Sequence, residues 1–190
     1  MAAFVTDSIF GAHLAWQFER ASALDRASDL VDIVPAPGEG NPPQRYVAAF
    51  HSKGLVSSGG GRVTEASEFA VGIYLPHDYL RRGGAALDGL TFDVLSLLGP
   101  VNVWHPNVRY PAICAGHLAP GTAIDEIVTQ VFEMLTYQRK NMREDNSLNP
   151  AAARWARNHQ DMFPIDARPL RRRAVNIEVE AIAGPEGGGA

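Results

Sequence analysis

This sequence has little cysteine, no long apolar run and no excess of basic residues. Its 190 residues include a single cysteine, Cys114, so no intramolecular disulfide can form and a disulfide-stabilised secreted scaffold is excluded. No uninterrupted stretch of about 18 apolar residues occurs, so we expect no transmembrane helix and no membrane partner. The start of the chain lacks the basic region and apolar run of a secretory signal, so we expect none. These absences favour the reducing cytoplasm.

The charge balance and the missing motifs exclude further classes of protein. The formal net charge of −4 argues against non-specific binding of nucleic acid. The histidines at positions 51, 77, 105 and 117 lack the spacing of metal ligands, and with one cysteine we expect no metal site. The glycine run at residues 59–61 lacks the Gly-Lys-Ser/Thr ending of a phosphate-binding loop, so it indicates a hairpin loop. We therefore expect no cofactor.

Composition and length predict one folded domain followed by a tail. Hydrophobic residues make up 46% of the chain and charged residues 20%, which is typical of a globular protein with a core. We expect the domain to cover residues 1–170. Residues 171–190 begin with three arginines and end rich in glycine, which predicts a flexible tail, although residues 175–179 alternate like an edge strand.

The pattern of apolar residues predicts an α+β fold. We expect a first helix over residues 8–31, including Phe10 and Phe18 on its apolar face and ended by Pro35. Strands are expected over residues 46–50, 55–56, 69–75, 91–98 and 101–104, with a loop over residues 110–119. Because helices flank a group of strands, the fold class is α+β.

Two helices are predicted after residue 121. Thr122 opens the first, where its side chain would cap the backbone amide of Asp125 and Asp125 would bond back. The apolar face of that helix comprises Ile124, Ile127, Val128, Val131 and Leu135. Asn149 is expected to cap the second helix, with Pro150 in its first position and an end near His159.

The residues with the clearest chemical potential are Cys114 and the upstream tripeptide His105-Pro106-Asn107. A lone cysteine is either a small buried side chain or a reactive thiol. A thiol that transfers acyl groups attacks a carbonyl, and a nearby donor must stabilise the oxyanion that forms. The Asn107 amide is such a donor, although an asparagine after proline is also a common turn residue. We favour the reactive interpretation of Cys114.

These motifs and the order of elements resemble ubiquitin-conjugating (E2) enzymes. The resemblance extends from about residue 8 to residue 163 and is carried by residues 73–79, 104–108, 113–114 and 145–151. Its most specific part is the His-Pro-Asn motif followed by Ile113-Cys114. The resemblance implies a ubiquitin-conjugating (UBC-like) fold, with an N-terminal helix, an antiparallel β-meander and C-terminal helices.

Two departures from the familiar pattern indicate a divergent member. Ala115-Gly116-His117 follows the cysteine where familiar members have Leu-Asp, and residues 118–120 replace their Trp-x-Pro segment. This shortened form resembles bacterial E2-like proteins that accompany an E1-like activating enzyme, a ubiquitin-like protein and a JAB-type peptidase. Such systems are associated with antiphage (antiviral) defence.

The resemblance implies a transferase that carries a ubiquitin-like protein as a thioester on Cys114 and transfers it to an amine of a target protein. Asn107 would stabilise the oxyanion, while His105 and Pro106 would shape the loop around the cysteine. The first helix would dock the E1-like enzyme, with Arg20 and Arg26 near its polar side.

Three further residues are candidates for a role near the thiol. His117 stands three residues after Cys114 and is either a general base or a loop residue that bonds a backbone carbonyl. Asn146 stands where the resemblance places an acidic residue that helps to deprotonate the incoming lysine, and the adjacent Asp145 could substitute for it. Both could equally be solvated loop residues.

Two functions of other classes stay open. The first is a noncatalytic binding module of E2-like fold, against which Cys114 argues because such variants usually lack the cysteine. The second is a cysteine hydrolase that uses Cys114 and His117, which would need an orienting partner and a substrate cleft.

Overall fold

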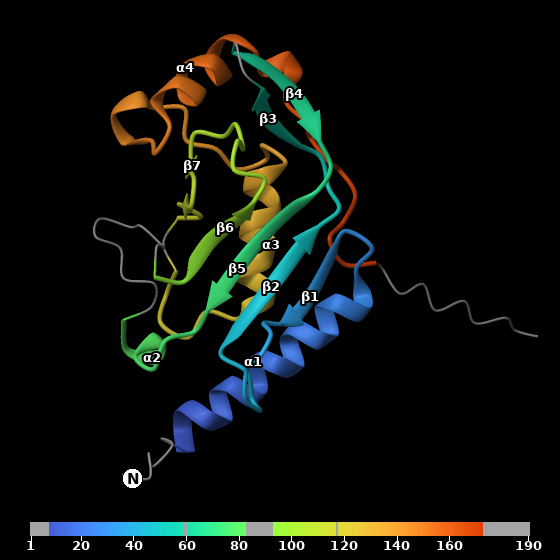
Figure 1. The fold of residues 1–190 in the computed structure, drawn as a ribbon, viewed down its shortest axis with the longest axis vertical. Helices are drawn as coiled ribbons and strands as arrows, with labels where there is room; N and C mark the ends of the chain where they lie inside the picture. Colours follow the sequence, from blue (N-terminus) through green and yellow to red (C-terminus); the bar gives the residue numbers. More distant parts are fainter. Residues whose placement is uncertain (1–7, 59–60, 83–92, 117, 173–190) are drawn as a thin grey trace, which may run out of the picture.

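The long helices lie at either end of the chain and the strands lie between them. The computed structural model describes residues 8–58, 61–82, 93–116 and 118–172. Helix α1 (Ser8–Ala27) comes first, and α3 (Ile124–Leu135) and α4 (Pro150–Asn158) follow the strands, so the predicted α+β class is confirmed (Figure 1). None of the helices in these ranges is both long and apolar enough to cross a membrane.

Six strands form one antiparallel sheet in the order β1-β2-β5-β6-β8-β7. The strands are β1 (Val31–Pro35), β2 (Arg45–Phe50), β5 (Phe69–Tyr74), β6 (Leu95–Gly99), β7 (Val108–Arg109) and β8 (Ala112–Ile113). Between β2 and β5, the strands β3 (Gly54–Ser58) and β4 (Arg62–Ala66) pair with each other. Figure 1 shows this hairpin at the same end of the molecule as α4. Short helical turns complete the fold: α2 (Tyr79–Arg82) and two 3₁₀ turns, η1 (Glu144–Asn146) and η2 (Gln160–Met162).

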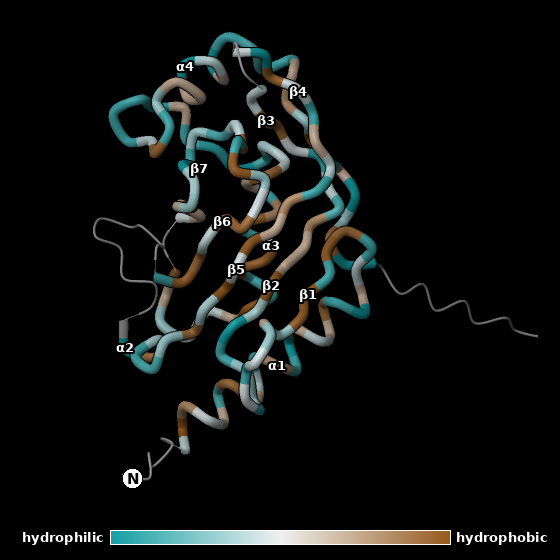
Figure 2. The backbone as a smooth tube through the Cα atoms, in the orientation of Figure 1, coloured by the Kyte–Doolittle hydropathy of each residue, from teal (hydrophilic) through white to brown (hydrophobic). Residues whose placement is uncertain are grey.

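One face of the sheet packs against α1 and α3. Side chains alternate across a strand, and every second residue of the central strands is buried, among them Tyr46, Ala48 and Phe50 in β2. The predicted apolar face of α3 is buried in full, which confirms that expectation. Figure 2 shows the corresponding hydrophobic stretches along the strands and α3. This core holds the strands from which the cysteine segment extends.

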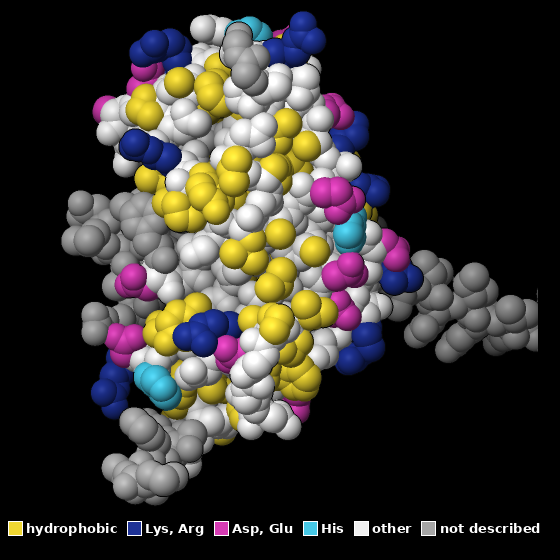
Figure 3. Space-filling model, in the orientation of Figure 1, with side chains coloured by type: hydrophobic (Ala, Val, Ile, Leu, Met, Phe, Trp, Pro, Cys, Tyr) yellow, Lys and Arg dark blue, Asp and Glu magenta, His cyan; other side chains and the backbone are white. Residues whose placement is uncertain are grey.

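No described helix covers the opposite face of the sheet (Figure 1). Val34 of β1 is 53% exposed and Leu98 of β6 is 49% exposed. Figure 3 shows hydrophobic side chains spread among polar ones on this side of the molecule. Apolar and polar side chains therefore do not alternate strictly along the strands, since apolar residues occur on both faces of the sheet.

The first helix is shorter than predicted. It ends at Ala27, because the Ser28 hydroxyl accepts a hydrogen bond from the Leu30 amide at 3.0 Å and turns the chain. Val31 already belongs to β1, where it pairs with Phe50. Phe18 was expected on the buried face and is 37% exposed.

The predicted cap of the helix after residue 121 is wrong. Helix α3 begins at Ile124, and the Thr122 hydroxyl donates to the Ala119 carbonyl at 2.7 Å instead of capping a helix amide. The cap comes from Gln17 of α1, which is fully buried. Its Oε1 accepts from the Ile124 amide at 2.7 Å, and its Nε2 donates to the Thr122 carbonyl at 3.0 Å. A residue over a hundred positions away therefore replaces the expected local cap.

Asp125 joins three parts of the chain. Its carboxylate is buried and accepts from Arg20 of α1 at 2.8 Å and 2.6 Å, and also from Arg171. The Arg172 amide donates to the Ala27 carbonyl at 2.8 Å. The start of the basic run therefore lies against the domain. Arg20 is held by this carboxylate while its side chain stays 39% exposed, so its role in docking stays a prediction.

The strand predictions were partly wrong. Strand β4 was not predicted, because its residues are mostly exposed and lack apolar alternation. Residues 101–104 form no strand, and only Val103 makes a bridge, to Val56. The predicted loop over residues 110–119 contains β8. Residues 91–92 of a predicted strand, the glycines at 59–60 and the predicted tail from residue 173 lie outside the described residues.

The prediction for the last helix is confirmed. Helix α4 begins at Pro150, and the Asn149 side chain accepts a hydrogen bond from the Ala152 amide at 3.1 Å. The Asn149 amide donates to the Pro106 carbonyl at 3.0 Å. The cap of α4 is thus fastened directly to the His-Pro-Asn segment.

Candidate functional site

A small hairpin brings Asn107 and Cys114 together. Strands β7 and β8 pair Val108 with Ile113 and Arg109 with Ala112. Asn107 and Cys114 flank the hairpin at its base, and the Cys114 amide donates to the Asn107 carbonyl at 2.8 Å. The residues between the motif and the cysteine are therefore paired strands and a turn. This pairing turns their separation in sequence into a direct contact.

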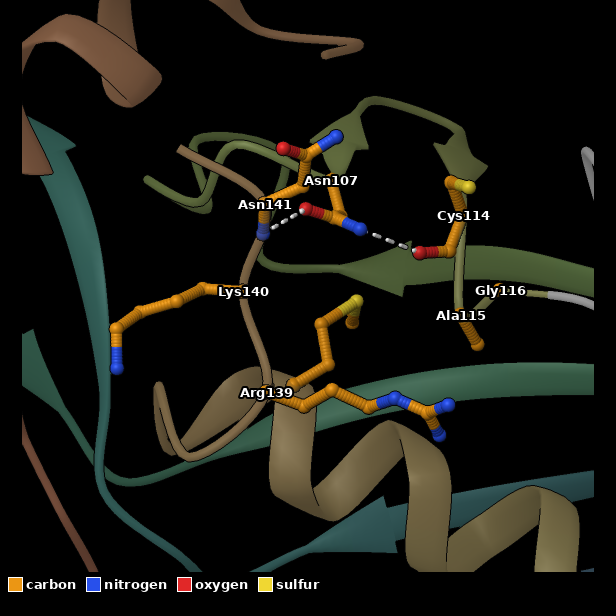
Figure 4. A pocket seen from close by; sticks show the side chains of 8 residues that line it. Asn107, Cys114, Ala115, Gly116, Arg139, Lys140 and Asn141 are labelled. Carbon is orange, nitrogen blue, oxygen red and sulfur yellow. Dashed lines mark hydrogen bonds between the residues drawn. The ribbon is translucent and has the colours of Figure 1, made fainter. Parts of the chain in front are cut away.

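The side-chain amide of Asn107 is held on both sides. Its Nδ2 donates to the Cys114 carbonyl at 3.0 Å, and its Oδ1 accepts from the Asn141 amide at 3.3 Å. Figure 4 shows the Asn107 amide lying between these two partners, with the sulfur of Cys114 on the side away from the amide. Because an amide nitrogen carries two hydrogens, one of them is not used by the Cys114 carbonyl.

Cys114 lies, half buried, at the edge of a hollow of about 160 Å³. The hollow is lined by residues from the hairpin, the end of α3 and the segment after it: Asn107, Cys114, Ala115, Gly116, Met134, Arg139, Lys140 and Asn141. Gly116 has a φ of +101°, which favours glycine because L side chains rarely adopt it. The backbone beside the thiol therefore turns without a side chain that would fill the hollow.

His105 is buried and neutral. Its Nδ1 accepts a hydrogen bond from the Asn107 amide at 3.0 Å, which places the ring proton on Nε2. Burial lowers the pKa of His105 to about 3, so the ring does not take up a proton near neutral pH. These facts support a role in shaping the loop, as the resemblance implies.

Tyr137 holds His105 from the other side. Its ring meets the His105 ring edge-on, with centroids 4.5 Å apart, and stacks on Phe163 at 4.8 Å. The Tyr137 hydroxyl donates to the Trp104 carbonyl, and burial raises its pKa. Its φ of 59° is unusual for a residue other than glycine and ends α3 sharply. A buried aromatic cluster therefore fixes the start of the His-Pro-Asn segment.

Arg139 and Lys140 extend in opposite directions from the segment after α3 (Figure 4). The Lys140 ammonium donates to the Tyr137 carbonyl at 2.8 Å and lies over the Phe163 ring at 4.7 Å. The Arg139 side chain runs toward Gly116, and a Cβ placed on Gly116 would lie 3.8 Å from Arg139 Nη2. Arg139 is thus the cation nearest the cysteine segment among the residues that line the hollow.

Asp145 and Asn146, the residues expected to help deprotonate the incoming lysine, do not line the hollow. Asp145 is exposed and pairs with Arg143 at 2.8 Å. Asn146 offers its backbone carbonyl to the Asn141 side chain at 2.9 Å, and neither residue 145 nor residue 146 lines the hollow. His117 lies outside the described residues, so its role as a base stays a prediction.

Tyr137, Arg139 and Asn141 were not found from the sequence. They follow α3, in a segment to which the sequence assigns no role. Their contacts with the hairpin depend on how α3 packs, and no local spacing indicates this. No group of three or more histidine, cysteine or acidic side chains that could hold a metal occurs in the part of the chain that the structure describes.

No protein-family model matches this chain, and no curated protein is significantly similar to it.

Proposed function

We propose that this protein is an E2-like conjugating enzyme that carries a ubiquitin-like protein as a thioester on Cys114. It would receive this protein from an E1-like activating enzyme and transfer it to an amine of a target protein. The protein would act in the cytoplasm of a bacterium, in an antiphage conjugation system. A JAB-type peptidase would be a further partner in that system.

The contact between Asn107 and Cys114 is the observation that carries this proposal. A hairpin holds the amide of Asn107 against the backbone of Cys114, with one hydrogen bond of 2.8 Å between backbones and one of 3.0 Å from the side chain to the Cys114 carbonyl. An acyl-transferring thiol needs a donor of this kind within reach of the carbonyl that it carries.

The order and arrangement of elements are compatible with a UBC-like fold. A helix precedes an antiparallel sheet, the cysteine follows the last strand of that sheet, and two helices come afterwards. The neutral, buried His105 and the fastening of α4 to Pro106 support the structural part that the motif plays in that fold.

The chemistry needs no cofactor on this chain. The Cys114 thiolate attacks the thioester carbonyl carbon of the activated ubiquitin-like protein, a C–S bond to Cys114 forms, and the E1 thiolate leaves. An amine nitrogen then attacks the same carbon, and the oxyanion that forms needs a hydrogen-bond donor. The C–N bond remains as an amide, and the Cys114 thiolate is released and takes up a proton.

A charging assay tests the proposal. The protein is incubated with ATP and with a cognate E1-like enzyme and ubiquitin-like protein, and the masses of the products are measured by mass spectrometry. We expect an adduct that reducing agent cleaves and that is absent in Cys114→Ala. In Cys114→Ser, an oxyester adduct that resists reducing agent is expected.

The same assay separates the alternatives. A noncatalytic binding module would bind the ubiquitin-like protein without an adduct in the wild type. A hydrolase would release the free ubiquitin-like protein from its activated form and accumulate no amide product. An adduct that forms normally on Cys114→Ala would refute the thioester on Cys114.

A further inference from the structure

Arg109 and Cys114 lie on the same face of the β7–β8 hairpin. Side chains alternate across a strand, and Val108 and Ile113 are buried while Arg109 is exposed. Asn107 and Cys114 are the next opposed residues along the hairpin, so Arg109 is a diagonal neighbour of the cysteine. Diagonal neighbours in an antiparallel pair are about 7–8 Å apart, which is within reach of a long side chain. A chain attached to the thiol therefore starts within reach of Arg109.

Arg109 also borders a second hollow, of about 560 Å³, between the hairpin and the start of α4. The described lining of this arginine hollow is Arg109, Leu148, Asn149, Pro150, Ala151 and Arg154. The Asn149 amide donates to the Pro106 carbonyl at 3.0 Å, so the hollow lies beside the His-Pro-Asn segment, where Figure 1 shows β7 next to α4. One guanidinium comes from each element and aliphatic groups lie between them, which suits a peptide that carries a carboxylate.

Positive charge is in excess around the arginine hollow. Arg154 contacts Glu144 at 2.7 Å, and Arg157 pairs with the same carboxylate. Arg109 forms no ion pair with any residue that the structure describes. These three positive charges and one negative charge leave an excess of two, in a chain whose formal net charge is −4. The charge at this place is therefore opposite to that of the whole chain and attracts anionic groups.

Building on the proposed function, we infer that the arginine hollow binds an acidic side chain in the C-terminal tail of the ubiquitin-like protein that Cys114 carries. The thioester fixes the end of the tail at the thiol, and an extended chain advances by about 3.3–3.6 Å per residue. The third and fourth residues from the end then lie about 7–12 Å from the thioester carbonyl, where their side chains meet Arg109. The tether also gives the tail a high effective concentration here, which an untethered anion such as a nucleic acid lacks.

Acylation of Cys114 by synthetic peptides tests this inference. Decapeptides that end in Gly-Gly are made as N-acetylcysteamine thioesters, with one glutamate third, fourth or ninth from the C-terminus, or with glutamine in its place. The Cys114 thiolate attacks the thioester carbonyl, a new C–S bond forms, and the N-acetylcysteamine thiolate leaves. Mass spectrometry gives the second-order rate constants. The rate constant of each peptide with glutathione, measured in the same way, corrects for its intrinsic reactivity.

We expect glutamate at the third or fourth position to raise the corrected rate constant about threefold or more over glutamine, and glutamate at the ninth position to change it little. Arg109→Glu should reverse this preference, while Arg109→Lys keeps the charge and should keep part of it. Arg81→Glu makes the same charge change in α2, which Figure 1 shows at the other end of the molecule from α4, and should leave the preference unchanged. Circular dichroism checks that each variant is folded.

Four results would overturn the inference. They are an absence of any preference for glutamate at the third or fourth position, an equal preference at the ninth position, an equal loss of preference in Arg81→Glu, and a lack of acylation of Cys114 by every peptide. An equal preference at the ninth position would indicate a general basic surface that attracts anions of any class. The series of peptides on the wild type does not depend on the folding of any variant.

The two proposals fail separately. If a cognate E1-like enzyme does not charge Cys114, the conjugating function is refuted whatever the peptides show. If charging occurs and the acylation rates do not depend on glutamate, only the acidic tail is refuted.

Discussion

Asn107 is bound before any substrate arrives. Its carbonyl oxygen and amide nitrogen contact the Asn141 amide and the Cys114 carbonyl at 3.3 Å and 3.0 Å, so its rotamer is fixed by two backbone groups. Preorganised donors stabilise charge better than mobile ones because they need no reorientation during the reaction. In the proposed function, the second amide hydrogen would bind the oxyanion.

We predict that Asn107→Ala slows discharge of the thioester to amines by about 10²-fold and leaves charging nearly intact. The reason is that an amine's attack builds an oxyanion that needs the amide donor. Single-turnover discharge after removal of the E1-like enzyme measures this step alone.

Asn107→Asp separates donation from packing in the same assay. Aspartate can still accept from the Asn141 amide but cannot donate while it is ionised. It should discharge as slowly as the alanine variant. A loss of charging in parallel with a fall in the unfolding midpoint would instead assign Asn107 a purely structural role.

At the scale of elements, α1 and α3 are joined by a buried side chain. Gln17 satisfies the first amide of α3 and the carbonyl before it, which a local cap would otherwise do. The buried hydroxyl of Tyr79 donates to the same Thr122 carbonyl at 2.7 Å. The start of α3 is therefore determined by tertiary contacts.

Gln17→Ala should lower the free energy of unfolding by about 1–3 kcal/mol, because the Ile124 amide is left buried without its partner. Urea unfolding followed by circular dichroism measures this. Thr122→Ala is the matched control, since its exposed hydroxyl bonds only the Ala119 carbonyl, and it should cost less than about 1 kcal/mol. An equal loss of unfolding free energy in the two variants would contradict the assignment of the cap to Gln17.

Patterns within one element could be predicted from the sequence, and contacts between elements could not. The apolar face of α3 and the Asn149-Pro150 start of α4 follow from spacing and capping chemistry. Thr122 fits a capping pattern equally well, but Gln17 occupies that position in space. The alternation at residues 101–104 predicted a strand, although only Val103 has a strand partner.

The candidate site follows the same rule: its local motifs could be predicted from the sequence, and its contacts between elements could not. Cys114 and Asn107 were recognised as a pair, whereas the hairpin that joins them was taken for a loop because its strands have only two residues each. Tyr137 and Arg139 carry no local signature of a site. Their importance depends on where the end of α3 lies relative to the hairpin.

At the scale of the whole molecule, charged contacts tie distant segments together. Asp125 accepts from α1 and from the segment after α4, and Asp166 accepts from Arg168 at 2.8 Å while its carbonyl accepts from Gln138 at 2.9 Å. The chain after α4 therefore runs back along the domain. Removing both Arg20 and Arg171 would leave the buried Asp125 carboxylate without a paired cation, which is costly.

His51 makes the stability of the molecule depend on pH. Its two ring nitrogens contact Asp32 at 2.8 Å and Glu68 at 2.9 Å, and these carboxylates raise its pKa. A raised pKa means that the folded state holds the proton more tightly than the unfolded state. This stabilisation is fully present below the unfolded pKa of about 6.5 and is lost as the pH rises through the higher folded pKa.

We predict that wild type exceeds His51→Gln in stability most clearly near pH 6, and that the difference shrinks toward pH 8. The effect is small because the His51 side chain is 39% exposed. Urea unfolding of both proteins at several pH values measures it. A difference that grows with rising pH would show that the histidine is bound in its neutral form.

The hairpin that pairs Asn107 with Cys114 also has an evolutionary consequence. Residues inserted or deleted at its tip, around Tyr110-Pro111, leave the pairs at its base unchanged, whereas a single insertion within a strand would turn one side chain to the opposite face. Descendants of such a chain can therefore gain or lose tip residues between the asparagine and the cysteine. The distance along the sequence can drift, while the asparagine and the cysteine remain neighbours.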